Sequence, residues 1–574
     1  MGRSWDDVED RLADFTRDRR IVLLSALALV VGVIAAFAAL ALVRLIGLVT
    51  NLAYFGRLSA AFVEPGAAAR SWGVLVPVAG GLAIGLLARF GSDKIRGHGI
   101  PEAIEAILVG RSRMSLRVAL LKPLASAISI GTGGPFGAEG PIIMTGGALG
   151  SLFAQGFHLS SAERKTLLVA GAAGGMAAIF ASPLAAILLA VELLLFEWRP
   201  RSFIPVAISA TVAAALRVPL LGPGPVFPVP PHVALGGLAL LPAFLLGLLA
   251  GAASGLLTAL VYGFEDLFER LPVHWMWWPA LGGLAVGLGG LVEPRALGVG
   301  YGSIHALLRG ELPAADAARL LAVKAVLWAF ALGSGTSGGV LAPLLLFGGA
   351  LGALAAPLVP LGDTGAWALV GMAAMMGGTM RSPLTGILFA IELTGDFALA
   401  GPLLIATGAS YAVTVLLLKR SILTEKVARR GYHLSREYSV DPLEILFARE
   451  VMRTQLVALP AESSLAEIHQ RLHSNHGSRG QYLYPLIDSQ NRLQGVITRK
   501  HLRPLLESPH LADAQPGRAG TGEPRGRLSG RAAPRGGEPD GRDWIHALSG
   551  GGSARRTQAA GNDLAPRPAW RAGA

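Results

Sequence analysis

The segment from Gly131 to Pro141, GTGGPFGAEGP, holds a single ionisable residue, Glu139, within a strongly apolar region of the chain. Ionisable side chains inside a bilayer are costly, and those that occur there are functional candidates by default. Glycine–proline segments cannot form regular lipid-facing helix at membrane depth, but they are tolerated where broken helices meet inside a protein. We therefore expect Glu139 to lie buried at the start of a broken helix.

Two further segments, Gly97–Pro101 and Gly338–Pro343, have the same glycine- and proline-rich character. The start of a helix carries free N–H groups and a partial positive charge, so several starts aimed at one point can bind an anion. Glu139 is itself an anion when ionised, so it can occupy the anion's place and leave it on protonation. The three segments predict an anion pathway gated by Glu139. The alternative is a structural role, in which Glu139 caps N–H groups or pairs with a base.

The elements that position these segments are predicted to be transmembrane helices. A span needs ~20 apolar residues. Such runs recur from about residue 21 to about residue 418, starting for example at Ile21, Trp72 and Pro402. Only 15% of the residues are charged, and glycine, which lets membrane helices pack closely, accounts for 75 of 574. The chain is therefore predicted to be an all-α polytopic membrane protein.

Other function classes find no support in the composition. No nucleophile–base set and no metal-ligand spacing occurs, so we expect neither an enzyme nor a metal site, and no cofactor in the membrane part. The chain has no cysteine, which excludes disulfides. The net charge of +12 does not indicate a nucleic-acid partner, because much of it lies in an arginine-rich tail and beside the spans.

Basic clusters beside the spans predict the orientation in the membrane. By the positive-inside rule they face the cytoplasm, which places both ends of the membrane part there, including the lead-in segment 1–20. We expect a multi-pass protein of a bacterial inner (plasma) membrane, in contact with lipid. The clusters are Arg17, Arg19 and Arg20; Lys94 and Arg96; Arg111, Arg113 and Arg117; and Lys419, Arg420, Lys426, Arg429 and Arg430.

The membrane part, residues 21–430, contains an internal repeat. SPLAAILLAVEL, from Ser182 to Leu193, matches SPLTGILFAIEL, from Ser382 to Leu393, at an offset of 200 residues. The sequence GGALG also occurs twice, and Lys122 falls opposite Lys324 at nearly the same offset. The repeats cover about residues 72–200 and 275–400. Duplicated halves are typical of transporters, whose substrate sites tend to lie at the repeat interface.

The three segments, taken in order, resemble the signature motifs of the CLC family of chloride channels and chloride/proton antiporters. The family has GSGIP-like, G(K/R)EGP and GxFxP motifs, and this chain has GHGIP from Gly97, GAEGP from Gly137 and GVLAP from Gly339. The resemblance covers roughly residues 20–430. It implies two inverted-topology repeats with broken helices, and a homodimer with one pathway per subunit.

The resemblance also assigns roles to residues. It implies that Glu139 is the gating glutamate and proton acceptor. It implies that the anion is bound by the backbone amides of Val340 and Leu341 and by the segment His98–Gly99. His98 stands where the family has a serine. A neutral imidazole can donate an N–H to an anion, and a protonated one would hold the anion more strongly.

Other departures from the family pattern bear on proton coupling and selectivity. Leu193 stands where antiporter members have an inner proton glutamate, which leaves Glu197 as a candidate proton relay. Leu423 falls where the family has a tyrosine, and Leu341 where it has a phenylalanine. The predicted function is transport of chloride or a similar small anion, with proton coupling left open. A passive voltage- or pH-gated chloride channel is the alternative, and a membrane sensor with a CBS output is another.

The chain after Arg430 is predicted to hold a soluble module. Residues 446–507 read as strand, helix, strand, a DSQNR turn, strand and helix, and resemble a single CBS domain. Paired CBS domains bind adenine nucleotides, but here the usual Thr-Arg-x-Asp ending is Thr498-Arg-Lys-His501. Nucleotide binding therefore stays open. Residues 508–574 are predicted to be a disordered tail, native or the product of a frameshift.

Overall fold

The computed structural model describes residues 20–431, except 67, 69–71, 109, 111, 230–231 and 233–234, together with 456–474 and 481–506. The chain divides into two units at residue 438, and each is described by itself. The predicted lead-in segment and the predicted disordered tail lie outside the described residues, apart from Arg20. So do residues 446–455, 475–480 and 507 of the predicted CBS domain.

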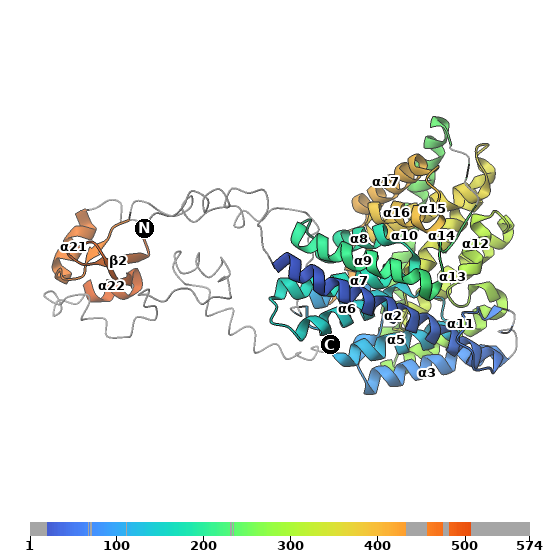
Figure 1. Cartoon of the computed structure of the whole chain (residues 1–574), viewed down its shortest axis with the longest axis horizontal. Coiled ribbons are helices and arrows are strands. Elements are labelled where there is room, and N and C mark those ends of the chain that lie inside the picture. The colour runs from blue at the N-terminus through green and yellow to red at the C-terminus, as the bar shows by residue number, and fades with distance from the viewer. Residues whose placement is uncertain are drawn as a thin grey trace, which may run out of the picture. The chain divides into compact units, whose positions relative to one another are not determined.

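The first unit is built from helices, as the sequence predicts (Figure 1). Among its described residues, six helices are long and apolar enough to cross a membrane. The longest, α2, lies along α9, α7 and α6. The elements are α2 (Arg20–Phe55), η3 (Trp72–Val74), α3 (Leu75–Phe90), η4 (Asp93–Ile95), α4 (Ile100–Leu108), α5 (Leu116–Gly131), α6 (Glu139–Gln155), α7 (Ser161–Phe180), α8 (Pro183–Leu189), the π-helix η5 (Ala190–Leu195), α9 (Pro200–Leu221), η6 (Gly237–Ala239), α10 (Leu240–Glu269), η7 (Trp275–Trp277), α11 (Trp278–Val292), η8 (Pro294–Ala296), α12 (Tyr301–Leu308), α13 (Ala314–Gly333), α14 (Leu341–Ala355), η9 (Ala356–Leu358), α15 (Thr364–Met380), α16 (Pro383–Thr394), α17 (Ala400–Leu417) and α18 (Ile422–Arg429).

The repeated GGALG sequence lies where two helices approach closely in each repeat. A Cβ added to Gly146 of α6 would lie 2.2 Å from the Gly171 carbonyl oxygen of α7. At the equivalent place in the second repeat, a Cβ on Gly348 of α14 would lie 2.3 Å from the Gly371 oxygen of α15. Any larger side chain would push these backbones apart, which explains why glycine recurs at these positions.

The two repeats contact each other through reciprocal backbone hydrogen bonds. The Gly137 N–H donates to the Gly339 oxygen at 3.1 Å, and the Gly339 N–H donates to the Gly137 oxygen at 2.8 Å. Both residues stand just before a helix start, α6 in the first repeat and α14 in the second. This mutual exchange relates the repeats by an approximate twofold axis through the glycine segments.

The repeats point in opposite directions. In the first, Glu102 of α4 pairs with Lys426 of α18 at 3.4 Å. In the second, α12 instead contacts the α2–α3 connection, where the Gly302 N–H donates to Glu64 at 3.2 Å. The 16 residues of α3, about 24 Å of helix, separate that connection from the Gly97 segment. Equivalent helix starts therefore open toward opposite sides, as an inverted repeat requires.

Two equivalent glutamates cap the helix starts of the opposite repeat. Glu392 accepts hydrogen bonds from the N–H groups of Leu184 (3.0 Å) and Ala185 (2.8 Å) at the start of α8. Glu192 does the same for Leu384 (3.3 Å) and Thr385 (3.0 Å) at the start of α16. A carboxylate at a helix start is stabilised by free N–H groups and by the helix dipole.

Replacing Glu392 by alanine is expected to lower the thermal midpoint of the protein in detergent, because two N–H groups of α8 lose their acceptor. The free energy of unfolding should fall by about 1–3 kcal/mol, a typical size for a charged capping interaction. Thermal unfolding of Glu392→Ala beside Glu392→Gln measures it, since glutamine keeps one acceptor oxygen and should lose less. Equal midpoints for wild type and Glu392→Ala would contradict this role.

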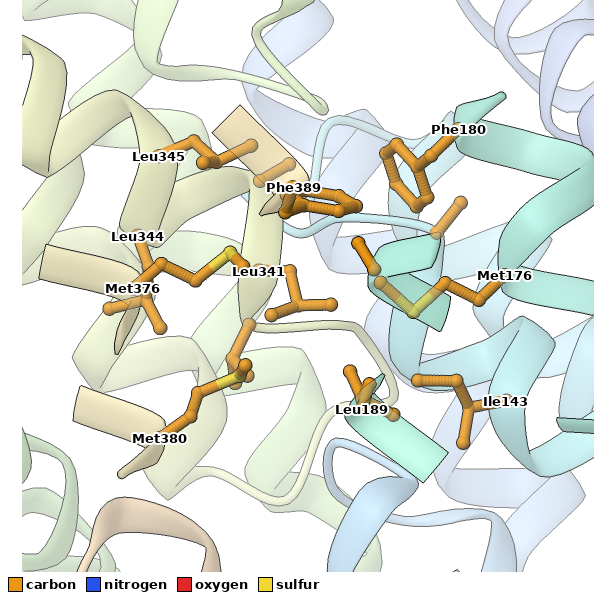
Figure 2. Close-up of a cluster of buried hydrophobic side chains, with 14 of the residues drawn as sticks. Ile143, Met176, Phe180, Leu189, Leu341, Leu344, Leu345, Met376, Met380 and Phe389 are labelled. Carbon is orange, nitrogen blue, oxygen red and sulfur yellow. The ribbon is translucent and has the colours of Figure 1, made fainter. Parts of the chain in front are cut away.

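The core between the repeats is apolar and includes side chains from both halves (Figure 2). The rings of Phe180 at the end of α7 and Phe389 of α16 meet edge to face, with centroids 5.1 Å apart. Leu341, at the start of α14, lies fully buried in the same cluster. The start of α14 therefore lies beside a buried apolar cluster that contains side chains of both repeats.

The second unit is the small α/β module predicted from the sequence. Strand β1 pairs in parallel with β2, which pairs antiparallel with β3. The DSQNR segment connects β2 to β3, as predicted. The elements are β1 (Leu459–Pro460), α21 (Leu465–Ser474), β2 (Leu483–Ile487), β3 (Leu493–Thr498) and α22 (Arg499–Leu506). Its buried core includes Leu459, Leu465, Ile468, Tyr484, Ile497 and Leu502.

Candidate functional site

Glu139 is the first residue of α6 and is fully buried. Its Oε1 accepts a hydrogen bond from the Ala342 N–H of α14 at 3.0 Å, while Oε2 has no partner among the described residues. A Cβ on Gly137 would lie 1.7 Å from Oε2, and one on Gly339 would lie 2.6 Å from it. The absence of side chains at these two glycines therefore leaves room for the carboxylate to lie against the start of α14 in the other repeat.

The start of α14 offers further N–H groups next to this carboxylate. Val340 is the N-cap residue and Leu341 the first residue of the helix. Neither N–H has a hydrogen-bond partner among the described residues. Since the first N–H groups of a helix have no partner within it, these two can bind an anion beside the place that Glu139 occupies. The structure thus puts both residues named from the family motif beside Glu139.

His98 and Gly99 bring the start of α4 against the start of α6. A Cβ on Gly140 would lie 1.9 Å from the His98 oxygen, so these backbones touch. His98 is 3% exposed, and its Nδ1 has no partner among the described residues. The Gly99 N–H, in contrast, donates to the Glu102 carboxylate at 2.8 Å. The Gly99 N–H therefore already has an acceptor, whereas the imidazole Nδ1 does not, and anion binding by Gly99 stays a prediction.

Removing the imidazole of His98 is expected to weaken chloride binding modestly. One neutral hydrogen bond contributes about 0.5–1.5 kcal/mol, so His98→Ala should lower the affinity roughly 2- to 12-fold. His98→Ser, which keeps a donor, should restore much of it. Calorimetric titration of the three proteins with chloride at one pH measures this. Equal affinities for wild type and His98→Ala would mean that the imidazole does not contact the anion.

A buried lysine holds the backbone of the Gly97 segment. The fully buried Lys122 donates from Nζ to the oxygens of Ile95 (2.9 Å) and Gly97 (2.7 Å). In a trans peptide the carbonyl and the following N–H point in opposite directions. Because the Gly97 oxygen faces Lys122, the His98 N–H points away from Lys122. Lys122 therefore orients the polar groups of this segment.

The second repeat has an equivalent lysine. Lys324, also fully buried, donates to the oxygens of Gly298 (3.0 Å) and Val299 (3.3 Å) before α12. The sequence showed the two lysines as a repeated pair but gave them no role. A cation at matching positions, beside two glycine-containing segments that also repeat, was the signal that could have identified them as backbone anchors.

Sequence reasoning also missed a group of contacts at the start of α12. Tyr301, which the repeat places opposite Ile100, begins α12 and packs against the rings of Phe62 (5.7 Å) and Phe227 (5.5 Å). The next residue, Gly302, bonds the Glu64 carboxylate. The repeat alignment could have pointed to Tyr301. Nothing in the sequence marks Glu64, because its contact joins segments 238 residues apart.

The residues considered for proton movement lie in and just after the π-helix η5. Leu193 is fully buried in the π-helix η5. Glu197 follows it and accepts a hydrogen bond from Ser202 at 2.6 Å, with Lys165 (3.9 Å) and Arg199 (3.7 Å) as ion-pair partners. Its carboxylate is thus partly neutralised by two cations. The role of Glu197 as a proton relay stays a prediction.

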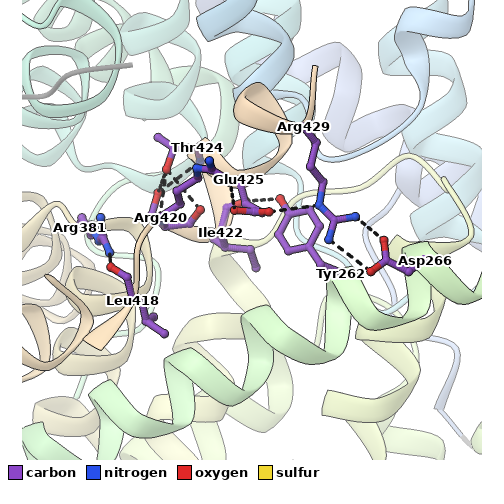
Figure 3. A network of polar contacts seen from close by, with 10 residues as sticks. Tyr262, Asp266, Arg381, Leu418, Arg420, Ile422, Thr424, Glu425 and Arg429 are labelled. Atoms are coloured by element: carbon purple, nitrogen blue, oxygen red, sulfur yellow. Dashed lines mark hydrogen bonds and ion pairs between the residues drawn. The ribbon is translucent and has the colours of Figure 1, made fainter. Parts of the chain in front are cut away.

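Polar contacts attach α18 to α10 (Figure 3). The Tyr262 hydroxyl of α10 donates to the Ile422 oxygen, and Arg429 pairs with Asp266. Leu423, where the family has a tyrosine, is fully buried. The family's side-chain hydroxyl is therefore replaced by a buried apolar group on a firmly held helix.

Helix starts from two inverted repeats, meeting around a buried carboxylate in a multi-span helical protein, define the class of anion-transporting membrane proteins. No group of three or more metal-ligating side chains that could hold an ion occurs in the part of the chain that the structure describes. The family model for voltage gated chloride channels matches residues 79–415, and that for the CBS domain matches residues 448–508. The chain belongs to the voltage gated chloride channel family, also known as CLC.

Relatives with named activities are similar to most of the membrane part. The H(+)/Cl(-) exchange transporter ClcA of Cronobacter sakazakii is 30% identical over 421 residues, covering 68% of this chain and 86% of that protein. The protein of the same name from Klebsiella pneumoniae is 32% identical over 348 residues, covering 56% and 70%. The crystal structure of a slow cyanobacterial Cl-/H+ antiporter has a TM-score of 0.63 at 22% identity, covering 72% of this chain and 98% of that one.

Proposed function

We propose that the protein exchanges chloride for protons across a membrane. The observation that carries the proposal is the position of Glu139, whose carboxylate accepts the Ala342 N–H where free N–H groups of α14 would hold an anion. Two relatives that are 30% and 32% identical to this chain are named H(+)/Cl(-) exchange transporters. Those relatives are transporters, and no enzymatic step is part of the proposal.

The mechanism follows from competition for one set of N–H groups. Ionised Glu139 occupies the start of α14 and excludes chloride. On protonation the carboxyl becomes neutral and loses its attraction to the partial positive charge of the helix start. Chloride then binds the N–H groups of Val340 and Leu341, with His98 on the other side. When the proton leaves, the carboxylate returns and displaces the ion, so each proton step is tied to an anion step.

Proton transfer between Glu139 and the cytoplasm needs a carrier that Leu193 cannot supply. Glu197 is the acidic side chain proposed for this role, with water completing the connection. Its carboxylate lies 3.9 Å from the Lys165 ammonium and 3.7 Å from the Arg199 guanidinium. Glu197→Gln should then slow proton movement more than chloride movement, whereas equal slowing would assign it a structural role.

The proposal includes orientation and assembly. The basic residues around α18, among them Lys426, Arg429 and Arg430, favour a cytoplasmic position for that side and for both termini. Surrounding lipid and a homodimer, with one pathway in each subunit, complete the arrangement that family membership implies. Cross-linking in native membranes tests the dimer.

No nucleotide is included in the proposed function. At the CBS end the Thr498 hydroxyl already lies 3.1 Å from His501 Nδ1 and accepts the His501 N–H at 3.3 Å. His501 stands where nucleotide-binding CBS domains have the ribose-binding aspartate. Titration of the full chain with ATP tests this choice, and saturable binding would require adding a nucleotide.

Reconstitution in liposomes tests the exchange itself. With opposed chloride and proton gradients, an exchanger lets the proton gradient drive chloride uphill, and its reversal potential depends on both ions. A passive channel follows the chloride gradient alone. Uphill chloride uptake supports the proposal, whereas a reversal potential indifferent to pH would replace it with the channel alternative.

A further inference from the structure

A large cavity lies beside the anion segments without including them. Its volume is about 710 Å³, within the ~300–1,000 Å³ range of small-molecule sites. None of the residues 97–99, 137–140 or 338–341 lines it. The wall comes from the α3–α4 connection, α4, the residues before α5, the start of α5, Met144 of α6 and Arg430 after α18. The cavity is thus a separate space on the side of the protein where α18 lies.

Three cations of the cavity wall have no counter-charge in direct contact. Lys94, Arg113 and Arg117 line the cavity, are exposed, and make no ion pair with any described residue. Basic side chains held together without acidic partners repel each other and favour a bound anion. We refer to Lys94, Arg113 and Arg117 as the cationic wall.

The acidic residues of the same cavity are already neutralised, with one exception. Glu102 pairs with Lys426 at 3.4 Å and with Arg430 at 3.3 Å, and Glu105 also pairs with Arg430. Only Asp93 remains to oppose the cationic wall. The net charge left in the cavity is therefore positive, and an anionic ligand would neutralise it.

The start of α5 adds to this positive character. Its first turn contains no acidic residue, although helices commonly place acids there. The hydroxyl of the N-cap residue Ser115 accepts one N–H, from Val118 at 3.4 Å. The remaining N–H groups of the first turn thus lie between Arg113 and Arg117.

We propose that the cationic wall binds a phosphate-bearing anion, supplied by the headgroup of an anionic phospholipid or by a soluble phosphate compound. Chloride is too small to span three separate cations in a cavity of this size, whereas a phosphate group presents several oxygens to Lys and Arg donors. The site belongs to neither the anion pathway nor the CBS unit, and it does not depend on the exchange mechanism.

The surface beside the cavity fits a lipid. Leu116 and Leu120 of α5, one turn apart, are 59% and 61% exposed. They flank Arg117, which lines the cavity. A phospholipid whose phosphate contacts Arg117 could lay an acyl chain along these leucines, and basic side chains at the cytoplasmic surface attract anionic lipids.

One residue of the cavity wall, Glu102, also contacts the Gly97 segment. Glu102 lines the cavity, pairs with Arg430 and also accepts the Gly99 N–H beside His98. A phosphate near Arg430 would compete with Glu102 for that guanidinium group. Occupancy of the cavity is therefore expected to change the chloride turnover rate.

The test compares the full chain with two triple variants of equal charge change. One removes the cationic wall, Lys94→Gln with Arg113→Gln and Arg117→Gln. The control removes three exposed cations outside the cavity, Arg201→Gln with Arg270→Gln and Lys419→Gln. Native mass spectrometry measures binding of phosphatidylglycerol, with phosphatidylcholine as the neutral lipid, and a second arm adds inorganic pyrophosphate.

We expect the cavity variant to bind phosphatidylglycerol at least about tenfold more weakly than wild type, and the control to stay within about twofold. Displacement of the lipid by pyrophosphate would identify soluble phosphate as a source, whereas no displacement would identify the lipid headgroup. The single variant Arg117→Gln serves if the triple variant does not fold. Equal lipid and pyrophosphate binding by the cavity variant, or by Arg117→Gln in its place, and the control would overturn the proposal.

Discussion

Glu139→Gln is expected to abolish proton movement while chloride continues to flow. Glutamine has nearly the same shape as the protonated carboxyl and carries no charge, so it cannot release a proton or return as an anion to the start of α14. In liposomes under a chloride gradient, proton movement should fall to the background of protein-free vesicles, a loss of well over tenfold. Chloride efflux should persist and lose its dependence on pH.

Glu192→Gln provides a matched control for this result. Glu192 is also a carboxylate bonded to N–H groups at a helix start, but that helix, α16, does not contribute to the anion segments. The folded fraction of Glu192→Gln should therefore keep proton coupling. If Glu139→Gln retains the pH dependence of the wild type, Glu139 is not the gate.

Lys122→Met is expected to abolish high-affinity chloride binding and to destabilise the protein. The substitution removes the side-chain donor of the buried Ile95 oxygen and leaves the Gly97 oxygen with only the Gly338 N–H at 3.4 Å, at a cost of about 1–3 kcal/mol for each lost bond. The Gly97 peptide is then held by one long hydrogen bond, and a rotation of this peptide would misdirect the His98 N–H. We expect the chloride affinity, measured by calorimetry, to fall at least about tenfold, together with a lower thermal midpoint.

The equivalent lysine of the other repeat separates stability from binding. Lys324→Met also removes the donor to two buried oxygens, so its thermal midpoint should fall by a similar amount. Its segment, however, does not carry His98, and chloride affinity should change less than about threefold. Equal losses of affinity in both variants would show that Lys122 acts through general stability and not by orienting the site.

The positions of the three anion-facing helix starts could be predicted from the sequence. Pro101, Pro141 and Pro343 each lie within the first turn of their helix, where a missing N–H does no harm and the fixed φ favours the helix. The preceding glycines allow the close approaches that a Cβ would block. The local sequence therefore determines where α4, α6 and α14 begin.

Other features of the site depend on contacts that local sequence does not determine. The lysine anchors act on carbonyl groups 25 or more residues away, and Glu64, which precedes the first repeat, contacts the start of α12 in the second repeat. The Glu102 cap is different, because a carboxylate three residues after Gly99 is a local capping pattern that could have been recognised. It would have predicted that the Gly99 N–H already has an acceptor.

The reciprocal glutamate caps have a consequence for biosynthesis. The carboxylate that completes the start of α8 belongs to Glu392, 208 residues after Leu184. Until the ribosome has translated Glu392, the first two N–H groups of α8 lack this acceptor. Final docking of α8 therefore follows release of nearly the whole membrane part. When the two halves are made as separate polypeptides, each is expected to persist in the cell only while the other is present.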